Sequence, residues 1–165
     1  MELRPEPLTR AAFAQFGDVI QVSEENQKFS INHGLTECHH NLATPDVNAE
    51  GGWPMISIFR SQAVDFPFPI KVMERHPLGS QAFMPLSGNP YLVVVAPAGD
   101  FRLTELRSFI AQSGQGVNYH RGTWHHYCMA LHGCSDFLVV DRGGQGSNCD
   151  EFPIADDPPV VIAPE

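Results

Sequence analysis

Short apolar runs with a period of two, separated by clusters of glycine and proline, constrain the fold of this 165-residue chain most strongly. In a β-strand alternate side chains share a face, so such runs predict half-buried strands. The expected strands are residues 55–59, 70–74, 82–84, 91–95, 107–111, 124–129 and 137–140. The pattern contains neither a long helix nor an alternation of strands with helices, which argues against a parallel α/β sheet. We therefore expect a mainly all-β protein, an antiparallel β-sandwich or barrel with one or two short helices.

One of these helices is expected near the N-terminus, over residues 9–16. Thr9 is a suitable N-cap, and Gly17 supplies a left-handed stop. The apolar stripe of this helix comprises Leu8, Ala12, Phe13 and Phe16. Residues 23–54 and 147–165 show little periodicity, and we expect them to wrap the barrel or to reach a partner subunit. The length of the chain predicts a single domain over residues 1–165.

Charge and composition exclude several classes of partner. The formal net charge of −9 repels nucleic acid and anionic lipid, so neither is expected to bind. The chain has no apolar stretch long enough to span a membrane, and residues 1–7 lack the features of a signal peptide. The four cysteines form no CxxC pair and are expected to be free thiols, which predicts a cytoplasmic protein. A small anion can still bind where Arg, His or backbone N–H groups lie close by.

Two segments far apart in the sequence carry candidate chemistry. Glu74 and His76 are two residues apart and share a strand face, and the turn before Gln81 can bring its amide back toward them. His125 follows a glycine-containing turn into another strand. Imidazole and carboxylate groups bind divalent transition ions, so these four residues are the predicted metal ligands. An amide oxygen is a poorer ligand than a carboxylate, and the same groups also suit hydrogen bonding and proton transfer without a metal.

The spacing of these residues resembles the two motifs of the cupin superfamily. The matching positions are Glu74, His76, Gln81, Gly88, His120, Gly122 and His125. Glu74 stands where cupins have a His, Gln81 where they have a Glu, and His120 where they have a Pro. Several segments are similar in amino-acid sequence to the ureidoglycolate lyase family, once named ureidoglycolate hydrolase. These segments are residues 74–86, 115–126, 136–144, 16–20 and 31–34. The likeness runs from about residue 8 to residue 150.

This resemblance implies a homodimeric, cytoplasmic, cupin-type barrel in the allantoin branch of purine breakdown, which serves nitrogen utilisation. The implied reaction converts (S)-ureidoglycolate, a small anionic substrate, to glyoxylate and urea. The family has been linked to nickel or another divalent ion. We therefore expect nickel first, then manganese or zinc, and no organic cofactor.

The implied reaction suits the residues present. Ureidoglycolate carries a hydroxyl and a urea nitrogen on one carbon, so elimination needs a base for the hydroxyl proton and an acid for the departing nitrogen. His76 or His125 is a suitable base, and Glu74 or His120 is a suitable acid if burial raises the carboxyl pKa. Within this set of catalytic candidates the assignment stays open.

The substrate carboxylate needs a cation or an amide cradle, and Arg142 is the arginine that we predict to bind it. Arg75 shares a strand with Glu74 but faces the opposite way. Asn32 and His33 are expected to cover the pocket and contact the substrate. Tyr119 is a further candidate contact, although burial alone explains an aromatic side chain at that position.

Three alternatives to the lyase remain open at this stage. The first is another cupin enzyme that acts on a small hydroxy acid or a sugar. The second is a ureidoglycolate amidohydrolase, which releases ammonia and carbon dioxide instead of urea. The third is a non-catalytic cupin that binds a small anion, because a fold does not fix a function.

Overall fold

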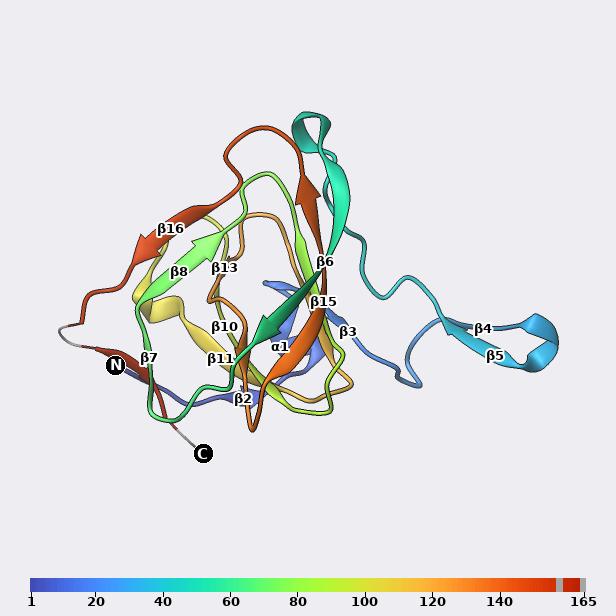
Figure 1. Ribbon diagram of the computed structural model, residues 1–165, viewed down its shortest axis with the longest axis horizontal. Coiled ribbons are helices and arrows are strands. Elements are labelled where there is room, and N and C mark those ends of the chain that lie inside the picture. The colour runs from blue at the N-terminus through green and yellow to red at the C-terminus, as the bar shows by residue number, and fades with distance from the viewer. Residues whose placement is uncertain (157–158, 164–165) are drawn as a thin grey trace.

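Two large β-sheets face each other in the computed structural model, which describes residues 1–156 and 159–163 (Figure 1). The first has the order β16 (Asp150–Pro153), β8 (Val72–Arg75), β13 (Trp124–His125), β10 (Tyr91–Ala96), β11 (Arg107–Ala111) and β2 (Glu6–Pro7), and β14 (Met129–Ala130) also pairs with β10. The second has the order β3 (Gly17–Ile20), β12 (Gly116–Tyr119), β9 (Gln81–Pro85), β15 (Ser135–Gly143) and β6 (Trp53–Ser61). The all-β, cupin-like prediction is confirmed.

Smaller elements complete the described part of the chain. A three-stranded sheet contains β1 (Glu2–Leu3), β17 (Val160–Ile162) and β7 (Phe68–Ile70). A two-stranded hairpin contains β4 (Lys28–Ile31) and β5 (Thr36–His39). The helical segments are α1 (Arg10–Phe13) and three 3₁₀ turns, η1 (Asn32–Gly34), η2 (Ala49–Gly51) and η3 (Leu103–Glu105). Pairing is antiparallel except between β1 and β17 and between β2 and β11.

The seven predicted strands are all present, with two changes. The expected strand 70–74 is divided between β7 and β8, and the expected strand 124–129 is divided between β13 and β14. Residues 116–119, predicted as part of a turn region, form β12, which pairs with β3 and β9. Residues 23–54 and the described part of 147–165, which showed little periodicity, also contain short strands, while residues 157–158 and 164–165 lie outside the described residues. Pairing with distant partners creates these strands, and that information is not local to the sequence.

The core explains why β10 is apolar at every position. Val93 and Val95 lie in the cluster between the two large sheets, together with Phe137 of β15. Leu92 and Val94 belong to a second cluster with residues of the three-stranded sheet, such as Ile162 of β17. Because both faces of β10 are covered, a continuous apolar run replaces the alternating pattern.

Helix α1 begins as predicted but ends differently. The Thr9 hydroxyl accepts a hydrogen bond from the Ala12 amide at 3.2 Å, as an N-cap does. The prediction that Gly17 stops the helix was wrong, because the helix ends at Ala14 and Gly17 begins β3. A Cβ at Gly17 would lie 2.0 Å from the carbonyl oxygen of Asn118, so close strand pairing requires glycine there.

No helix in the described part of the chain has the length and apolar character needed to cross a membrane.

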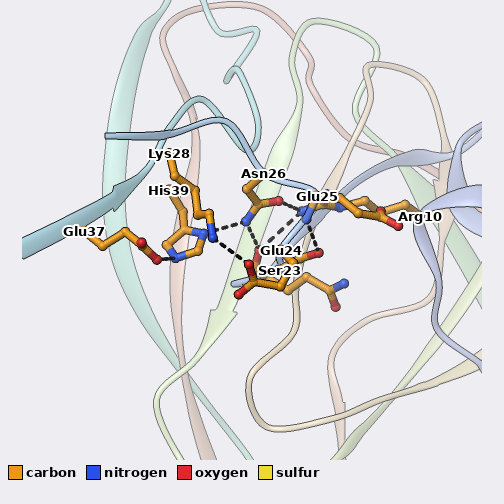
Figure 2. Close-up of polar contacts among 9 residues, drawn as sticks. Arg10, Ser23, Glu24, Glu25, Asn26, Lys28, Glu37 and His39 are labelled. Carbon is orange, nitrogen blue, oxygen red and sulfur yellow. Dashed lines mark hydrogen bonds and ion pairs between the residues drawn. The ribbon is translucent and has the colours of Figure 1, made fainter. Parts of the chain in front are cut away.

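The hairpin of β4, η1 and β5, which we call the arm, projects away from the two large sheets (Figure 1). A polar network holds its base (Figure 2). The Asn26 amide nitrogen lies 2.9 Å from His39 Nδ1 and also donates to the Gln21 carbonyl, while Lys28 pairs with Glu24 at 2.8 Å. Three large apolar side chains farther along the arm are exposed: Phe29, Ile31 and Leu35.

Candidate active site

A pocket of about 280 Å³ opens where strands of the two large sheets end. Its lining residues are His76, Gln81, Asp141, Arg142, Asn148 and Cys149. The backbone pairings explain how they meet. Glu74 on β8 lies opposite His125 on β13, and Ala82 on β9 lies opposite Val140 on β15, which makes Gln81 and Asp141 the next pair along. Residues that lie 51 and 60 positions apart in the chain therefore converge on one end of the sandwich.

His76, which lines the pocket, and the buried His125 beside it each have a defined orientation. His76 Nδ1 lies 2.6 Å from the Asn148 carbonyl oxygen, and His125 Nδ1 lies 3.3 Å from the His126 carbonyl oxygen. A carbonyl only accepts, so both Nδ1 atoms carry the proton and both Nε2 atoms keep a lone pair. Both Nε2 atoms are buried and have no protein partner. The ring centroids are 5.1 Å apart. This arrangement leaves two free imidazole lone pairs side by side.

Glu74 completes a group of potential metal ligands. One ligand atom each of Glu74, His76 and His125 lies within 4.8 Å of the others. Burial lowers the pKa of His125 to about 3, assisted by the nearby His76, so its imidazole is neutral at ordinary pH. The 3.7 Å approach of Glu74 to His125 Nδ1 is therefore not an ion pair. Burial also raises the pKa of Glu74, although His76 opposes this effect.

These features fit a divalent cation. Metal-bound histidines usually present one nitrogen to the ion and donate the other N–H to a carbonyl or carboxylate. His76 and His125 already make that second bond, and their free Nε2 atoms are left for a ligand. Gln81, the fourth predicted ligand, lines the same pocket, but its amide nitrogen is bound to Asp141.

The ring of Tyr119 stacks on the imidazole ring of His125. The two rings are parallel, with an interplanar angle of 1° and centroids 4.3 Å apart. Tyr119 lies on β12, is buried, and does not line the pocket. Burial keeps the pKa of its hydroxyl well above the usual range, so the phenol stays protonated. The structure therefore places Tyr119 behind the imidazole and not on the substrate side.

Arg142 is a buried cation at the pocket. Its side chain is only 5% exposed, and it donates from Nε to the Ala49 carbonyl and from NH2 to the Gln145 carbonyl, both at 3.0 Å. No carboxylate lies within 4.0 Å of its guanidinium among the described residues. A buried guanidinium without a protein counter-charge favours an anionic ligand.

Three lining residues were absent from the sequence-based prediction. Asp141 directly precedes Arg142 at the end of a predicted strand, and this adjacency was the available signal. Asn148 holds His76 through its carbonyl and the Leu78 amide through its side chain. Cys149 is exposed and lines the pocket beside Glu74. Nothing in the local pattern of residues 147–150 distinguished the last two.

Three predicted site residues lie elsewhere. His120, proposed as an acid, is at the surface, where its Nε2 lies 3.1 Å from Asp18. Asn32 and His33 occupy the tip of the arm with positive φ values of 55° and 57°, and they do not line the pocket of their own chain. The structure does not bring these residues to the pocket of the single chain: His120 pairs with Asp18 at the surface, and the arm carries Asn32 and His33 away from the two large sheets (Figure 1).

Two other arginines also have structural partners. Arg75 faces away from the pocket as predicted: it pairs with Asp150 at 2.9 Å and lies over the Trp124 ring at 4.6 Å. Arg121 pairs with Asp46 at 2.5 Å near the surface. Arg142 is therefore the arginine of the three that lines the pocket.

Comparison with known proteins identifies the family. The family model described as ureidoglycolate lyase matches residues 1–162. The chain belongs to the ureidoglycolate lyase family. A ureidoglycolate lyase of Burkholderia cepacia is 56% identical over 153 residues, which cover 92% of this chain and 86% of that protein. One from Pseudomonas fluorescens (strain Pf0-1) is 50% identical over 160 residues, which cover 96% and 95% respectively.

Family membership confirms the resemblance drawn from the residues, and with it the prediction of a lyase. The family model matches nearly the full length of the chain, and the matched range 1–162 includes every position that lines the pocket. The arrangement offers a cation for a carboxylate, two imidazoles whose Nε2 atoms have no protein partner, and a half-buried carboxyl group. Such a set can bind a small acid and move protons at one carbon.

Proposed function

We propose that this chain eliminates urea from (S)-ureidoglycolate and releases glyoxylate. The observation that carries the proposal is a buried Arg142 with no acidic partner among the described residues, in one pocket with the free Nε2 of His76. The guanidinium binds the substrate carboxylate, and this contact places the hydroxyl-bearing carbon next to the imidazole. A ureidoglycolate amidohydrolase would bind the same carboxylate, so the products and not this contact separate the two activities.

The elimination follows from the groups on the two sides of the pocket. A lone pair on His76 or His125 takes the hydroxyl proton, the C=O bond of glyoxylate forms, and the C–N bond breaks with its electrons moving to nitrogen. The departing nitrogen takes a proton and leaves as urea. Glu74, whose pKa burial raises, replaces His120 as the acid closest to both histidines.

We further propose that Glu74, His76 and His125 hold a divalent ion, with nickel first, then manganese or zinc. The support is that one ligand atom of each of the three residues lies within 4.8 Å of the others, and that the buried Nε2 atoms of both histidines have no protein partner. Such an ion would supply Lewis-acid chemistry that lowers the pKa of the substrate hydroxyl, and the three side chains would then act as its ligands instead of as base and acid. Gln81, the fourth predicted ligand, is left out of this set, because its amide oxygen has no protein partner and is an acceptor that a bound substrate can use.

We also propose that two copies of the chain form a homodimer through the arm and the outer face of β6. Leu35 on the arm is 89% exposed and Ile56 on β6 is 74% exposed. The other exposed apolar residues of these two surfaces are Phe29, Ile31, Trp53, Met55, Ile58 and Phe59. A two-stranded hairpin is marginal in water by itself, and apolar patches of this kind mark interfaces. A second copy supplies both surfaces at once.

Sedimentation tests the dimer. Leu35→Lys combined with Ile56→Lys should convert a dimer to a monomer, whereas the matched change Val22→Lys, at a position that is 76% exposed outside both surfaces, should not. A wild-type monomer at micromolar concentration would contradict the proposal.

We also propose that the chain is one domain over residues 1–165 and lies in the cytoplasm. The family match over residues 1–162 and the four free cysteines support this proposal.

The activity is tested by product analysis. Chelator-treated protein is incubated with (S)-ureidoglycolate, with and without nickel, manganese or zinc, and urea, ammonia and glyoxylate are quantified. Urea equal to glyoxylate is expected, and ammonia in its place would indicate the amidohydrolase. His125→Ala should abolish turnover, whereas the surface change His132→Ala should not. Absence of turnover with every ion would favour a non-catalytic binding protein.

A further inference from the structure

Gln81 and Asp141 form a fixed pair across strands β9 and β15. The Gln81 amide nitrogen donates to Asp141 Oδ2 at 3.3 Å. This bond orients the amide, because its nitrogen must face the carboxylate and its oxygen must therefore point elsewhere. Both residues line the pocket that holds His76 and Arg142.

The remaining oxygen of each residue has no partner. Gln81 Oε1 and Asp141 Oδ1 are buried and accept no hydrogen bond from the described residues. Most buried polar atoms in proteins do have a partner, and an unpaired acceptor at a pocket indicates a ligand that donates. Two such acceptors on neighbouring side chains indicate two donors on one edge of the ligand.

The protein itself does not satisfy Asp141. No Lys, Arg or His nitrogen in the described chain lies within 4.0 Å of its carboxylate, and the adjacent Arg142 donates instead to the carbonyls of Ala49 and Gln145. Asp141 is also outside the group formed by Glu74, His76 and His125. The carboxylate is therefore available to a neutral N–H donor of a bound molecule.

We propose that Gln81 and Asp141 are the subsite that recognises the ureido group of the substrate. A ureido group presents an N–H from each of its two nitrogens along one edge, and these match the two free acceptors. The substrate then lies with its carboxylate on Arg142 and its ureido edge on Gln81 and Asp141. The pair rejects acids in which the terminal amino group is replaced by a methyl group, because an acceptor would stay unpaired. This inference rests on the proposed function, since it assigns the second end of the same substrate.

Calorimetric titration with unreactive acids tests the subsite without turnover. N-Carbamoylglycine keeps the carboxylate and the ureido group but lacks the hydroxyl, N-acetylglycine replaces the terminal amino group by methyl, and glycolate lacks the ureido group. In the wild type, N-carbamoylglycine should bind ~10- to 100-fold more tightly than N-acetylglycine, the range expected for a hydrogen bond to a charged group. Asp141→Asn should remove most of this difference and leave glycolate binding unchanged. Asp136→Asn, an exposed change on the same strand, is the matched control.

Two results would overturn the inference. The first is equal affinity of the wild type for N-carbamoylglycine and N-acetylglycine. The second is an equal loss of affinity for all three acids in Asp141→Asn, which would show that the substitution affects the pocket as a whole. Retained glycolate binding shows that the variant is folded. Failure of the proposed function can be distinguished from failure of this subsite, because in that case the wild-type protein yields no urea from (S)-ureidoglycolate.

Discussion

The imidazole of His125 lies flat on the ring of Tyr119, with an interplanar angle of 1° and ring centroids 4.3 Å apart. Tyr119 in turn packs against Phe13 and Phe83 of the core between the sheets. Because the core is densely packed, the position of the imidazole is fixed by residues that never reach the substrate. The candidate site is thus an extension of the hydrophobic core.

Shortening Tyr119 should therefore damage both stability and the site. Tyr119→Ala is expected to cost about 3–5 kcal/mol of unfolding free energy, as for other buried aromatic residues, and to weaken metal binding by about tenfold or more. Tyr119→Phe keeps the stacked ring and should stay within about 1 kcal/mol of the wild type. Urea denaturation and metal titration measure the two effects. A large loss of metal affinity in Tyr119→Phe would show that the hydroxyl matters and the stack does not.

The proposed metal site predicts that alanine substitutions of His76, His125 and His120 differ in their effect on the binding of a divalent ion. His76→Ala or His125→Ala should each abolish tight binding of one divalent ion per chain, because each removes a free Nε2. His120→Ala should bind as the wild type does, because that side chain pairs with Asp18 at the surface. Calorimetry with nickel on chelator-treated protein is the measurement. Equal losses in all three variants would place the ion elsewhere.

His126 makes stability depend on pH. Burial lowers its pKa to about 4, so between pH 6.5 and 4 the unfolded chain binds a proton that the folded chain does not. Unfolding free energy should therefore fall as the pH falls, with a contribution from His126 of about 2 kcal/mol between pH 7.5 and pH 5. Denaturation of metal-free protein at both pH values should show a smaller fall in His126→Gln. An unchanged pH dependence in this variant would contradict the assignment.

Cys149 predicts sensitivity to thiol reagents. It lines the pocket and is exposed, whereas Cys134 is exposed without lining the pocket. Alkylation with iodoacetamide should remove most of the wild-type activity, and Cys149→Ser should resist while Cys134→Ser stays sensitive. Burial and the nearby Glu74 raise the pKa of Cys149, so inactivation should accelerate as the pH rises into the alkaline range. Mass spectrometry of the modified peptide confirms the position.

Gly17 predicts a large effect of a small change. An added Cβ would lie 2.0 Å from the Asn118 carbonyl oxygen, and a backbone atom cannot move aside cheaply. Gly17→Ala should destabilise the protein by about 2 kcal/mol or more. Gly114 has open space around its Cβ position, so Gly114→Ala should stay within about 0.5 kcal/mol of the wild type. Comparable thermal midpoints for the two variants would show that β3 and β12 can separate.

Sequence patterns accounted for much of the fold and for half of the site. Period-two runs located the strands that carry Glu74 and His125 and the middle of β15, because alternation is a local consequence of half-buried strands; Arg142 lies beyond the predicted part of β15. The spacing of Glu74 and His76 placed both side chains on one face of the strand. The amino-acid sequence of the segments that carry these residues indicated the family. These are short-range properties that a linear sequence displays directly.

The tertiary structure decided which of these residues meet. Asp141 joins Gln81 only because β9 and β15 pair in one register, between residues 60 positions apart in the chain. His120 points to Asp18, and the arm carries His33 away from the pocket, because solvent-facing turns are not constrained by the apolar pattern. The sequence by itself thus determined the strands and the chemical groups available. Long-range strand pairing determined the site, since register across a sheet depends on the packing of the whole core.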